Sequence, residues 1–267
     1  TRDSSSLIHL MPDPKVPSSI EYWQLLEKWL KKCSDMYVYE YDPVSWTGSL
    51  YSPIYLQRAK AIKKQYEMGI QGIINDTNRA DATLFMNKYM ELRFKNNPRL
   101  NPEDELADVC NRFFGKAGKF MNRYYLELAK VTDCKEDVRF GIAGYDRIFS
   151  KKMVKRSSSF LKRAIKIADK EDDPAIKERL QMVQLAQNYL EAYMNFIWNL
   201  TKKNYELSCE DSEKIFTAIN ALGSADPNYI RVEDAKRRLT TAVKKNMAIV
   251  FSDEMKFIKN WQMLGLY

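Results

Sequence analysis

Acidic side chains at the ends of two apolar segments are the residues of this sequence best suited to catalysis. Glu40 and Asp42 stand two positions apart in one segment, and Asp76 ends the other. Hydrolysis of a glycosidic bond uses two carboxyl groups, about 5–5.5 Å apart in retaining enzymes and about 6.5–9.5 Å apart in inverting enzymes. Two residues on one strand face lie in this general range, so we predict catalytic roles for Glu40, Asp42 and Asp76. The alternative is that these acids cap loops or pair with Arg58 or Arg79.

Aromatic and amide residues beside these acids are the predicted ligand contacts. Tyr39 and Tyr41 belong to the first apolar segment, and Trp46 follows it in a loop. Flat aromatic rings suit the apolar faces of sugar rings, although core packing is the alternative for the two tyrosines. Asn75, which precedes Asp76 in the second segment, joins the predicted binding residues, as does His9 if the segment around it follows a preceding strand. The alternative for His9 is a hydrogen-bonded loop histidine.

An alternation of helices and strands must position these residues. Aromatic and β-branched residues over 36–42 indicate a strand, and the run 69–76 is typical of a short buried strand. Apolar residues at helical spacing predict helices over residues 18–30, 54–68 and 80–96, the first of them starting at a capping box of Ser18 and Glu21. Strands joined by a crossover helix pair in parallel, so we expect a parallel pair.

The two faces of the first strand carry different side chains. Its three tyrosines share one face, whereas Glu40 and Asp42 share the other. Ligand sites of parallel sheets lie at the carboxyl ends of the strands. Because two such strands do not make a stable sheet by themselves, we interpret this region as the last βα units of a larger sheet or of a (β/α)8-type barrel.

The rest of the sequence indicates a helical bundle. Asn101, followed by Pro102 and two acidic residues, is a strong helix start. The longest predicted helix covers about residues 175–203, and its two apolar stripes indicate a central place in the bundle. We therefore predict a mostly α fold with a small parallel α/β portion, divided into a barrel-end region at residues 1–98 and a helical bundle domain at residues 99–267.

The composition excludes several kinds of site. A single histidine and four scattered cysteines do not suit a metal site, and no glycine-rich phosphate-binding motif occurs. No apolar run approaches the roughly 20 residues of a membrane span. We therefore expect no metal, no cofactor and no membrane partner.

One basic run lies in the predicted bundle. The chain has 43 Lys and Arg against 35 Asp and Glu, a net charge of +8, which permits an acidic partner without requiring one. The run contains no acidic residue and no recognition motif accompanies it, so we expect a solvated helix face rather than a nucleic-acid site. Its residues are Lys151, Lys152, Lys155, Arg156, Lys162, Arg163 and Lys166.

Several short motifs, taken together, resemble a known family. The segments are Tyr66–Ile73, Tyr89–Arg93 and Phe113–Gly118, then Phe160–Ala164, Lys177–Leu180 and Tyr189–Leu190 in the helical tail. This pattern is similar to an uncharacterised glycoside-hydrolase-like family related to α-glucuronidases and β-hexosaminidases. The resemblance implies that the region before the bundle is the end of a (β/α)8 barrel whose front is missing from this sequence. It also implies a periplasmic or secreted location.

Two functions follow as expectations. The first is a carbohydrate-active protein, the C-terminal portion of a glycoside-hydrolase-like enzyme that acts on or binds a glycan or oligosaccharide. Because a barrel that lacks most of its strands exposes parallel edges, an N-terminal barrel segment or a partner chain would complete it. The second is a non-enzymatic helical module that binds a protein or a nucleic acid, in which the α/β start has only a structural role.

Overall fold

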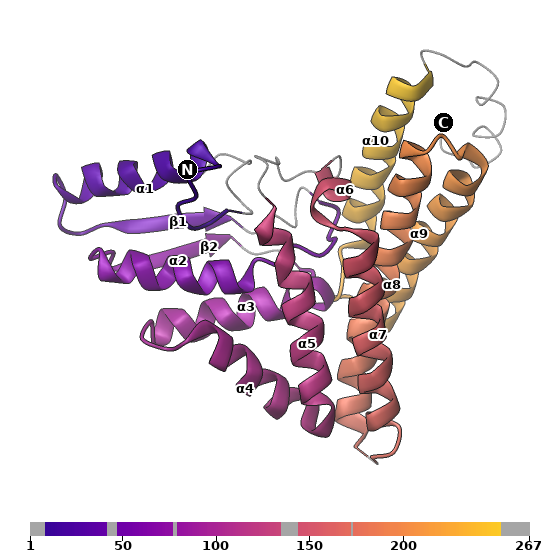
Figure 1. Ribbon diagram of the computed structural model, residues 1–267, viewed down its shortest axis with the longest axis horizontal. Coiled ribbons are helices and arrows are strands. Elements are labelled where there is room, and N and C mark those ends of the chain that lie inside the picture. The colour runs from indigo at the N-terminus through magenta and orange to yellow at the C-terminus, as the bar shows by residue number, and fades with distance from the viewer. Residues whose placement is uncertain (1–8, 42–46, 77–78, 135–143, 172, 252–267) are drawn as a thin grey trace.

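The computed structural model describes residues 9–41, 47–76, 79–134, 144–171 and 173–251, and most of these residues are helical (Figure 1). The first part of the chain alternates between helix and strand, as the sequence predicts. Its elements are helix α1 (Pro17–Leu30), strand β1 (Tyr37–Tyr41), helix α2 (Tyr55–Glu67), strand β2 (Gly72–Asp76) and helix α3 (Asp81–Asn96).

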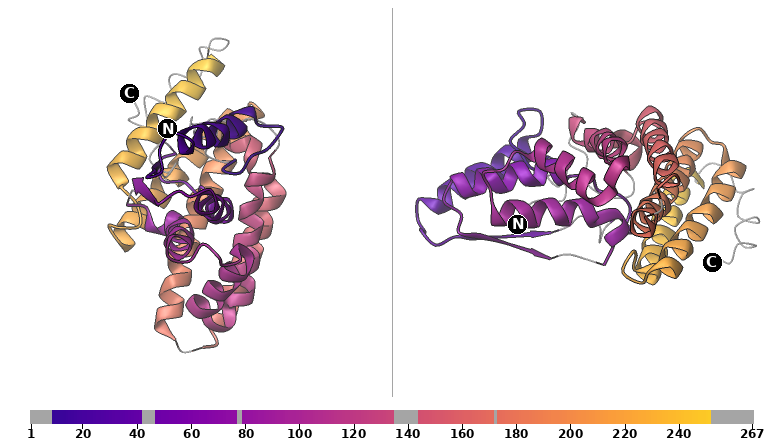
Figure 2. Two further views of the ribbon diagram at one scale, coloured as in Figure 1. Left: turned by 90° about the vertical axis from the view of Figure 1, so that its left-hand side faces the viewer. Right: turned by 90° about the horizontal axis from the view of Figure 1, so that it is seen from below.

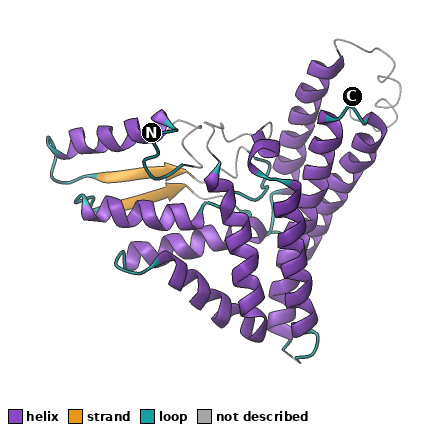
Figure 3. Cartoon of the chain, viewed as in Figure 1, coloured by secondary structure: helices purple, strands orange, loops and turns teal. Residues whose placement is uncertain are grey.

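The two strands form a parallel pair, which confirms the predicted mostly α fold with a small parallel α/β portion. Both strands run toward the remaining helices, so their carboxyl ends lie at the centre of the molecule (Figure 3). β2 is shorter than the predicted run 69–76, because Gly69, at a φ of +96°, turns the chain after α2. The predicted burial of this strand is wrong at Ile74, whose side chain is 56% exposed.

Among the described elements, the helices cover one face of this sheet (Figure 2). Val38 of β1 belongs to an apolar cluster with Trp23 and Leu26 of α1 and Ala61 of α2. Burying apolar side chains of this size stabilises a fold by about 1.5–3 kcal/mol each. The contact therefore attaches the strand pair to its helical layer on the face that carries Val38.

The helix starts show which capping signals were reliable. α1 begins at Pro17, and Ser18 is not its cap, because proline occupies the first turn and no side chain caps the helix. Helix α4 (Pro102–Phe114) begins as predicted. Asn101 Oδ1 accepts hydrogen bonds from the backbone N–H groups of Glu103 at 2.9 Å and Asp104 at 3.0 Å.

Helix α8 (Pro174–Thr201) is the longest helix described and matches the predicted range of 175–203. It packs against α9 and α7 and also against α3 and α4, so its apolar residues contact several neighbours. The other helices are α5 (Gly118–Ala129), α6 (Tyr145–Ile148), α7 (Lys151–Ala168), α9 (Tyr205–Ala225) and α10 (Val232–Phe251), with single 3-10 turns at Gly115–Ala117 and Lys130–Asp133.

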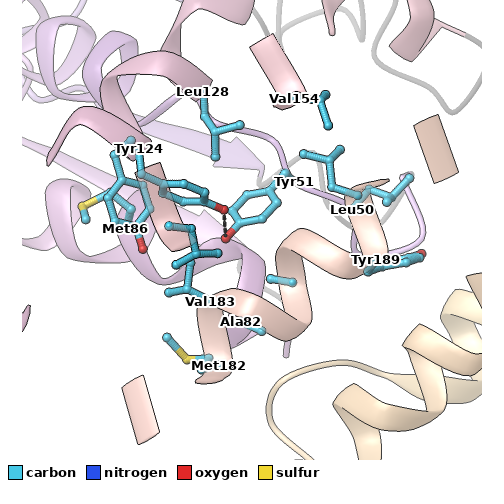
Figure 4. Packing of buried hydrophobic residues seen from close by; sticks show 14 of the residues in the cluster. Leu50, Tyr51, Ala82, Met86, Tyr124, Leu128, Val154, Met182, Val183 and Tyr189 are labelled. Atoms are coloured by element: carbon cyan, nitrogen blue, oxygen red, sulfur yellow. Dashed lines mark hydrogen bonds between the residues drawn. The ribbon is translucent and has the colours of Figure 1, made fainter. Parts of the chain in front are cut away.

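One large apolar cluster extends from Leu50 to Leu239 and contains residues from both sides of position 98. Figure 4 shows part of it, where the hydroxyl groups of Tyr51 and Tyr124 share a hydrogen bond of 3.1 Å. The Tyr124 hydroxyl also lies 3.1 Å from Gln187 Oε1 of α8. Burial raises the pKa of both tyrosines, so they remain neutral hydrogen-bonding groups inside the core.

The buried connection, residues 47–54 between β1 and α2, is irregular but enclosed by helices. Gly48 adopts a φ of +63° there, a conformation that glycine accepts at little cost. Buried backbone carbonyl groups need hydrogen-bond donors, and side chains of three helices supply them. Tyr189 of α8 donates to the carbonyl of Gly48 at 2.6 Å, and Tyr145 of α6 donates to the carbonyl of Tyr51 at 2.8 Å. From α3, Thr83 donates to the carbonyl of Ser49 at 2.9 Å, and Asn87 donates to the carbonyl of Ser52 at 2.7 Å.

We expect Tyr189→Phe to lower the free energy of unfolding by about 1–3 kcal/mol, because it leaves the buried Gly48 carbonyl without this donor. The measurement is urea unfolding of the wild type and the variant. Tyr66→Phe is the matched control, since Tyr66 is 52% exposed on α2, and it should change stability by less than about 0.5 kcal/mol. Equal effects of the two substitutions would show that the buried connection does not depend on this hydrogen bond.

A polar network around Glu105 joins α3 to α4. The Glu105 carboxylate is buried and accepts hydrogen bonds from Arg93 Nε at 2.6 Å and the Tyr89 hydroxyl at 2.8 Å. The Arg93 hydrogen bond lowers the pKa of Glu105 against the opposing effect of burial, and the Tyr89 hydroxyl lowers it further. The charged form of Glu105 is therefore the form that stabilises the fold.

Stability should depend on pH through Glu105. A carboxyl group with a depressed pKa in the folded state contributes fully above the pKa of the unfolded chain, here 4.5, and its contribution disappears as the pH falls through the lower folded-state value. Glu105→Gln should therefore cost about 2 kcal/mol at pH 7 and much less at pH 3. Denaturant unfolding at both pH values measures this difference. The control is Glu67→Gln at the exposed end of α2, whose effect on the free energy of unfolding should be small and the same at both pH values.

Candidate functional site

The carboxyl ends of β1 and β2 lie side by side, where the sequence predicts the site. Glu40 pairs with Asn75 in the strand register, and Tyr41 pairs with Asp76. The parallel alignment brings four predicted site positions to one edge of the sheet. The helix that follows each strand begins beyond this edge, as in other βα units.

Glu40 is held on the helix-covered face of the sheet. It is 3% exposed, and its Oε2 lies 3.2 Å from the guanidinium of Arg58, which is itself buried on α2. Its Oε1 accepts hydrogen bonds from the Tyr22 hydroxyl at 3.1 Å and from Gln65 Nε2 at 3.2 Å. The pairing with Arg58 is thus the arrangement found for Glu40, as the alternative interpretation of the sequence anticipated.

A second carboxylate continues this network to β2. Glu91 of α3 accepts a hydrogen bond of 2.6 Å from Asn75 Nδ2 and lies 2.5 Å from Lys95 Nζ. Its Oε2 is also 3.9 Å from Arg58 Nε. Arg58 therefore stands between two buried carboxylates, and the buried polar network connects both strands to α2 and α3.

The residues that the structure describes leave the opposite face of the sheet open. Tyr37 is 66% exposed, Tyr39 is 46% exposed and Ile74 is 56% exposed. Tyr39 and Ile74 are paired in the register, and Tyr37 lies two residues before Tyr39 on the same face. Core packing, the alternative for Tyr39, is therefore not observed. Parallel sheets in proteins are normally covered on both faces, so an apolar, uncovered face is unusual for this kind of pairing.

Other predicted site residues are placed differently. His9 is buried, at 4% exposure, close in sequence to Leu10, whose carbonyl accepts a hydrogen bond from the Trp23 indole at 3.1 Å. Asp42 and Trp46 lie outside the described residues. For Tyr41 and Asp76 the structure describes the backbone, which places both positions at the strand ends.

The partners of Glu40 are the residues that sequence reasoning identified least well. Arg58 was considered only as one possible ion-pair partner, and Gln65 was not singled out. Arg58, Ile62 and Gln65 follow helical spacing and are all buried on α2. Polar side chains on the apolar stripe of a helix are the signal that could have identified them, because buried polar groups require partners.

Two further findings concern only the described residues. Within them, no three metal-binding side chains lie together. The same residues include no helix that is both long enough and apolar enough to cross a membrane.

The buried network can be tested by a double-mutant cycle. We expect Arg58→Met and Glu40→Gln each to lower the free energy of unfolding by about 3 kcal/mol, because each leaves buried polar groups unpaired. The double variant should lose less than the sum by at least about 1 kcal/mol. The control cycle uses Lys60 and Glu103, an exposed pair with a distance of 2.7 Å between Nζ and Oε1, and should give a coupling below about 1 kcal/mol. Equal coupling in the two cycles would contradict a special role for the buried pair.

The comparisons with known proteins concern the same part of the chain. A family model described as a domain of unknown function (DUF4838) matches residues 8–126. No curated protein and no solved structure matches the chain. The matched range contains both strands and the helices α1 to α4 and continues into α5. It therefore covers the strand ends and the buried polar network, but not α7 to α10.

Proposed function

We propose that this chain is the C-terminal portion of a glycoside-hydrolase-like enzyme that acts on or binds a glycan. In this proposal β1 and β2 are the last two strands of a larger (β/α)8-type sheet. The remaining strands come from an N-terminal segment of the same polypeptide or from a partner chain. The resemblance of the sequence motifs to a glycoside-hydrolase-like family motivates the proposal.

The open face of the sheet is the observation that carries this proposal. Among the described residues, the parallel sheet has two strands and helices on one face only. Closing the sheet into a barrel would cover Tyr37, Tyr39 and Ile74 with side chains from further strands and would pair the outer edges of both strands. In such a barrel the helix-covered face points outward, so Glu40 and Arg58 lie between the strands and the helical layer.

This arrangement assigns different roles to the acidic residues. Glu40, paired with Arg58 and bonded by Tyr22 and Gln65, is a positioning residue that holds β1 against α1 and α2. Asp76, whose register position belongs with Tyr39 on the open face, supplies one of the two carboxyl groups that glycoside hydrolysis requires. The second carboxyl group comes from a completing strand. Tyr41, whose register position at the end of β1 is on the same face as Asp76, supports the sugar ring.

The test uses the complete polypeptide or complex in which this chain occurs. We expect it to hydrolyse at least one member of a panel of 4-nitrophenyl glycosides and glycuronides, and Asp76→Asn to lower kcat by about 100-fold or more. Asp108→Asn is the control, because Asp108 is an exposed residue of α4 that pairs with Arg112, and it should leave the rate unchanged.

Two results would contradict the proposal. One is a complete polypeptide that shows neither hydrolysis across the panel nor binding on a glycan array. The other is full activity of Asp76→Asn, which would remove this residue from the site. The helical-module alternative predicts the first result, together with an α/β region that is stable without further strands.

A further inference from the structure

A groove between α7 and α8 combines features that the strand-end site does not use. It has a volume of about 510 Å³ and lies outside the range that the family model matches. One wall is a stripe of α7 and the other a stripe of α8. The residues that carry the argument are Lys151, Lys155, Ser158 and Lys162 of α7, and Glu191 and Trp198 of α8.

Within the described part of the chain, the three lysines of the groove form no ion pair. No described carboxylate lies within 4.0 Å of Lys151, Lys155 or Lys162, and α7 contains no acidic residue. Arg156, on the same helix, differs because its guanidinium lies 3.6 Å from Glu127. The groove therefore presents a positive field that a bound anion would satisfy.

The second feature is the indole ring of Trp198. It lines the groove in a half-buried position, and Lys151 Nζ lies 5.2 Å from the ring centroid. Burial and the ammonium group of Lys202 lower the pKa of Lys151, which indicates that positive charge is concentrated at this end. The ammonium group of Lys151 thus lies over the indole ring, and this end of the groove combines positive charge with an aromatic residue.

The third feature is a hydrogen-bond acceptor, the carboxylate of Glu191, among the lysine donors. The Glu191 carboxylate lines the same groove and accepts a hydrogen bond of 2.9 Å from Gln187. A carboxylate only accepts hydrogen bonds, so it favours ligands with hydroxyl or amine donors. A ligand that satisfies all three features needs negative charge, hydroxyl donors and a flat apolar face.

We propose that the α7–α8 groove is a binding site for an anionic oligosaccharide, with carboxylate or sulfate groups on the lysines, a sugar ring on Trp198 and sugar hydroxyls on Glu191. Lys151 and Lys162 are eleven positions apart on α7, a separation of about 16 Å along the helix. The site therefore accommodates an extended oligomer rather than a single monosaccharide. It is independent of the strand ends and does not require a completed barrel.

Nucleic acid is the less favourable occupant of this groove. The groove lining supplies its positive charge through lysines, which act as point charges on phosphate, sulfate and carboxylate groups alike, so the difference lies in the other side chains. Arg156 faces Glu127, and Arg163 lies 6.0 Å from the ring of Phe120. Trp198 is the one aromatic residue of the lining, whereas proteins that bind single strands stack successive bases on several rings.

The experiment measures binding to the intact chain by isothermal titration calorimetry. The probes are a heparin-derived hexasaccharide, an oligogalacturonate of the same length, neutral xylohexaose and a single-stranded DNA 12-mer. We expect binding of one or both anionic saccharides, no binding of xylohexaose, and weaker binding of DNA. A preference between the first two probes identifies sulfate or carboxylate as the recognised group.

Variants separate a specific groove from general attraction to a basic protein. The triple variant Lys151→Gln, Lys155→Gln, Lys162→Gln should weaken saccharide binding by about tenfold or more. The matched control removes the same charge from exposed lysines outside the groove, Lys152→Gln, Lys166→Gln and Lys170→Gln, and should weaken binding by less than about threefold. An equal loss in both triple variants would overturn the proposal.

Trp198 provides the second criterion. Trp198→Ala should weaken binding by about fivefold or more, and Trp198→Phe, which keeps an aromatic face, should restore most of the affinity. Saccharide binding should also change the tryptophan fluorescence of the wild type but not of Trp198→Phe, a readout that does not depend on the folding of the alanine variant. The proposal would be overturned if DNA bound more tightly than the saccharides or if neither anionic saccharide bound. It would also be overturned if saccharide binding changed the fluorescence of Trp198→Phe as much as that of the wild type. None of these results would alter the test of Asp76, which concerns a different site.

Discussion

The hydrogen bonding of the buried connection is the constraint on which the rest of the structure depends. Residues 47–54 have no regular secondary structure, so isolated backbone hydrogen bonds, such as Leu50 N–H to the carbonyl of Thr47, replace the continuous pattern of a helix or sheet. Side chains of α3, α6 and α8 donate to four of their carbonyl groups. The segment leads directly into α2, so these bonds attach α2, together with the strand pair that packs on it, to the bundle. The carboxyl ends of the strands consequently face the helices at a defined position rather than at the end of a flexible linker.

The strand pair has two faces that serve different purposes. On the helix side, Glu40, Arg58 and Glu91 form a buried network of charges, and replacing such a network with apolar residues is often neutral or favourable for stability. The network is better explained by the positioning of the strands, because its directional contacts hold both strands in one alignment against α2 and α3. On the other side, Tyr37, Tyr39 and Ile74 remain exposed. Buried charges thus position the strands on one face, and apolar residues remain uncovered on the other. Both features fit the proposal that further strands complete this sheet.

The local patterns of the sequence predicted the elements well, because they depend on neighbouring residues. Period-two alternation separated Tyr39 from Glu40, the crossover helix implied parallel pairing, and Asn101 identified the start of α4. Relations between distant residues could not be predicted in this way. Nothing in the sequence near Tyr189 indicates that its hydroxyl meets Gly48, since the two residues are 141 positions apart and come together only through packing of the bundle. The exposure of Ile74 was missed for the same reason, because an apolar run does not reveal whether both of its faces are covered.

The lysines of α7 show what the sequence of a single helix can and cannot predict. The lysines of α7 are correctly described as exposed, and on their own they would be a solvated surface. The neighbouring helix α8 places Trp198 and Glu191 in the same groove as these lysines, and this makes a binding site possible. An exposed ammonium group in water gains little from a single distant anion, but several such groups along one groove, beside an aromatic face, act on the same ligand. The ligand-binding capacity of this surface therefore belongs to the pairing of α7 with α8, and the sequence of α7 alone could not indicate it.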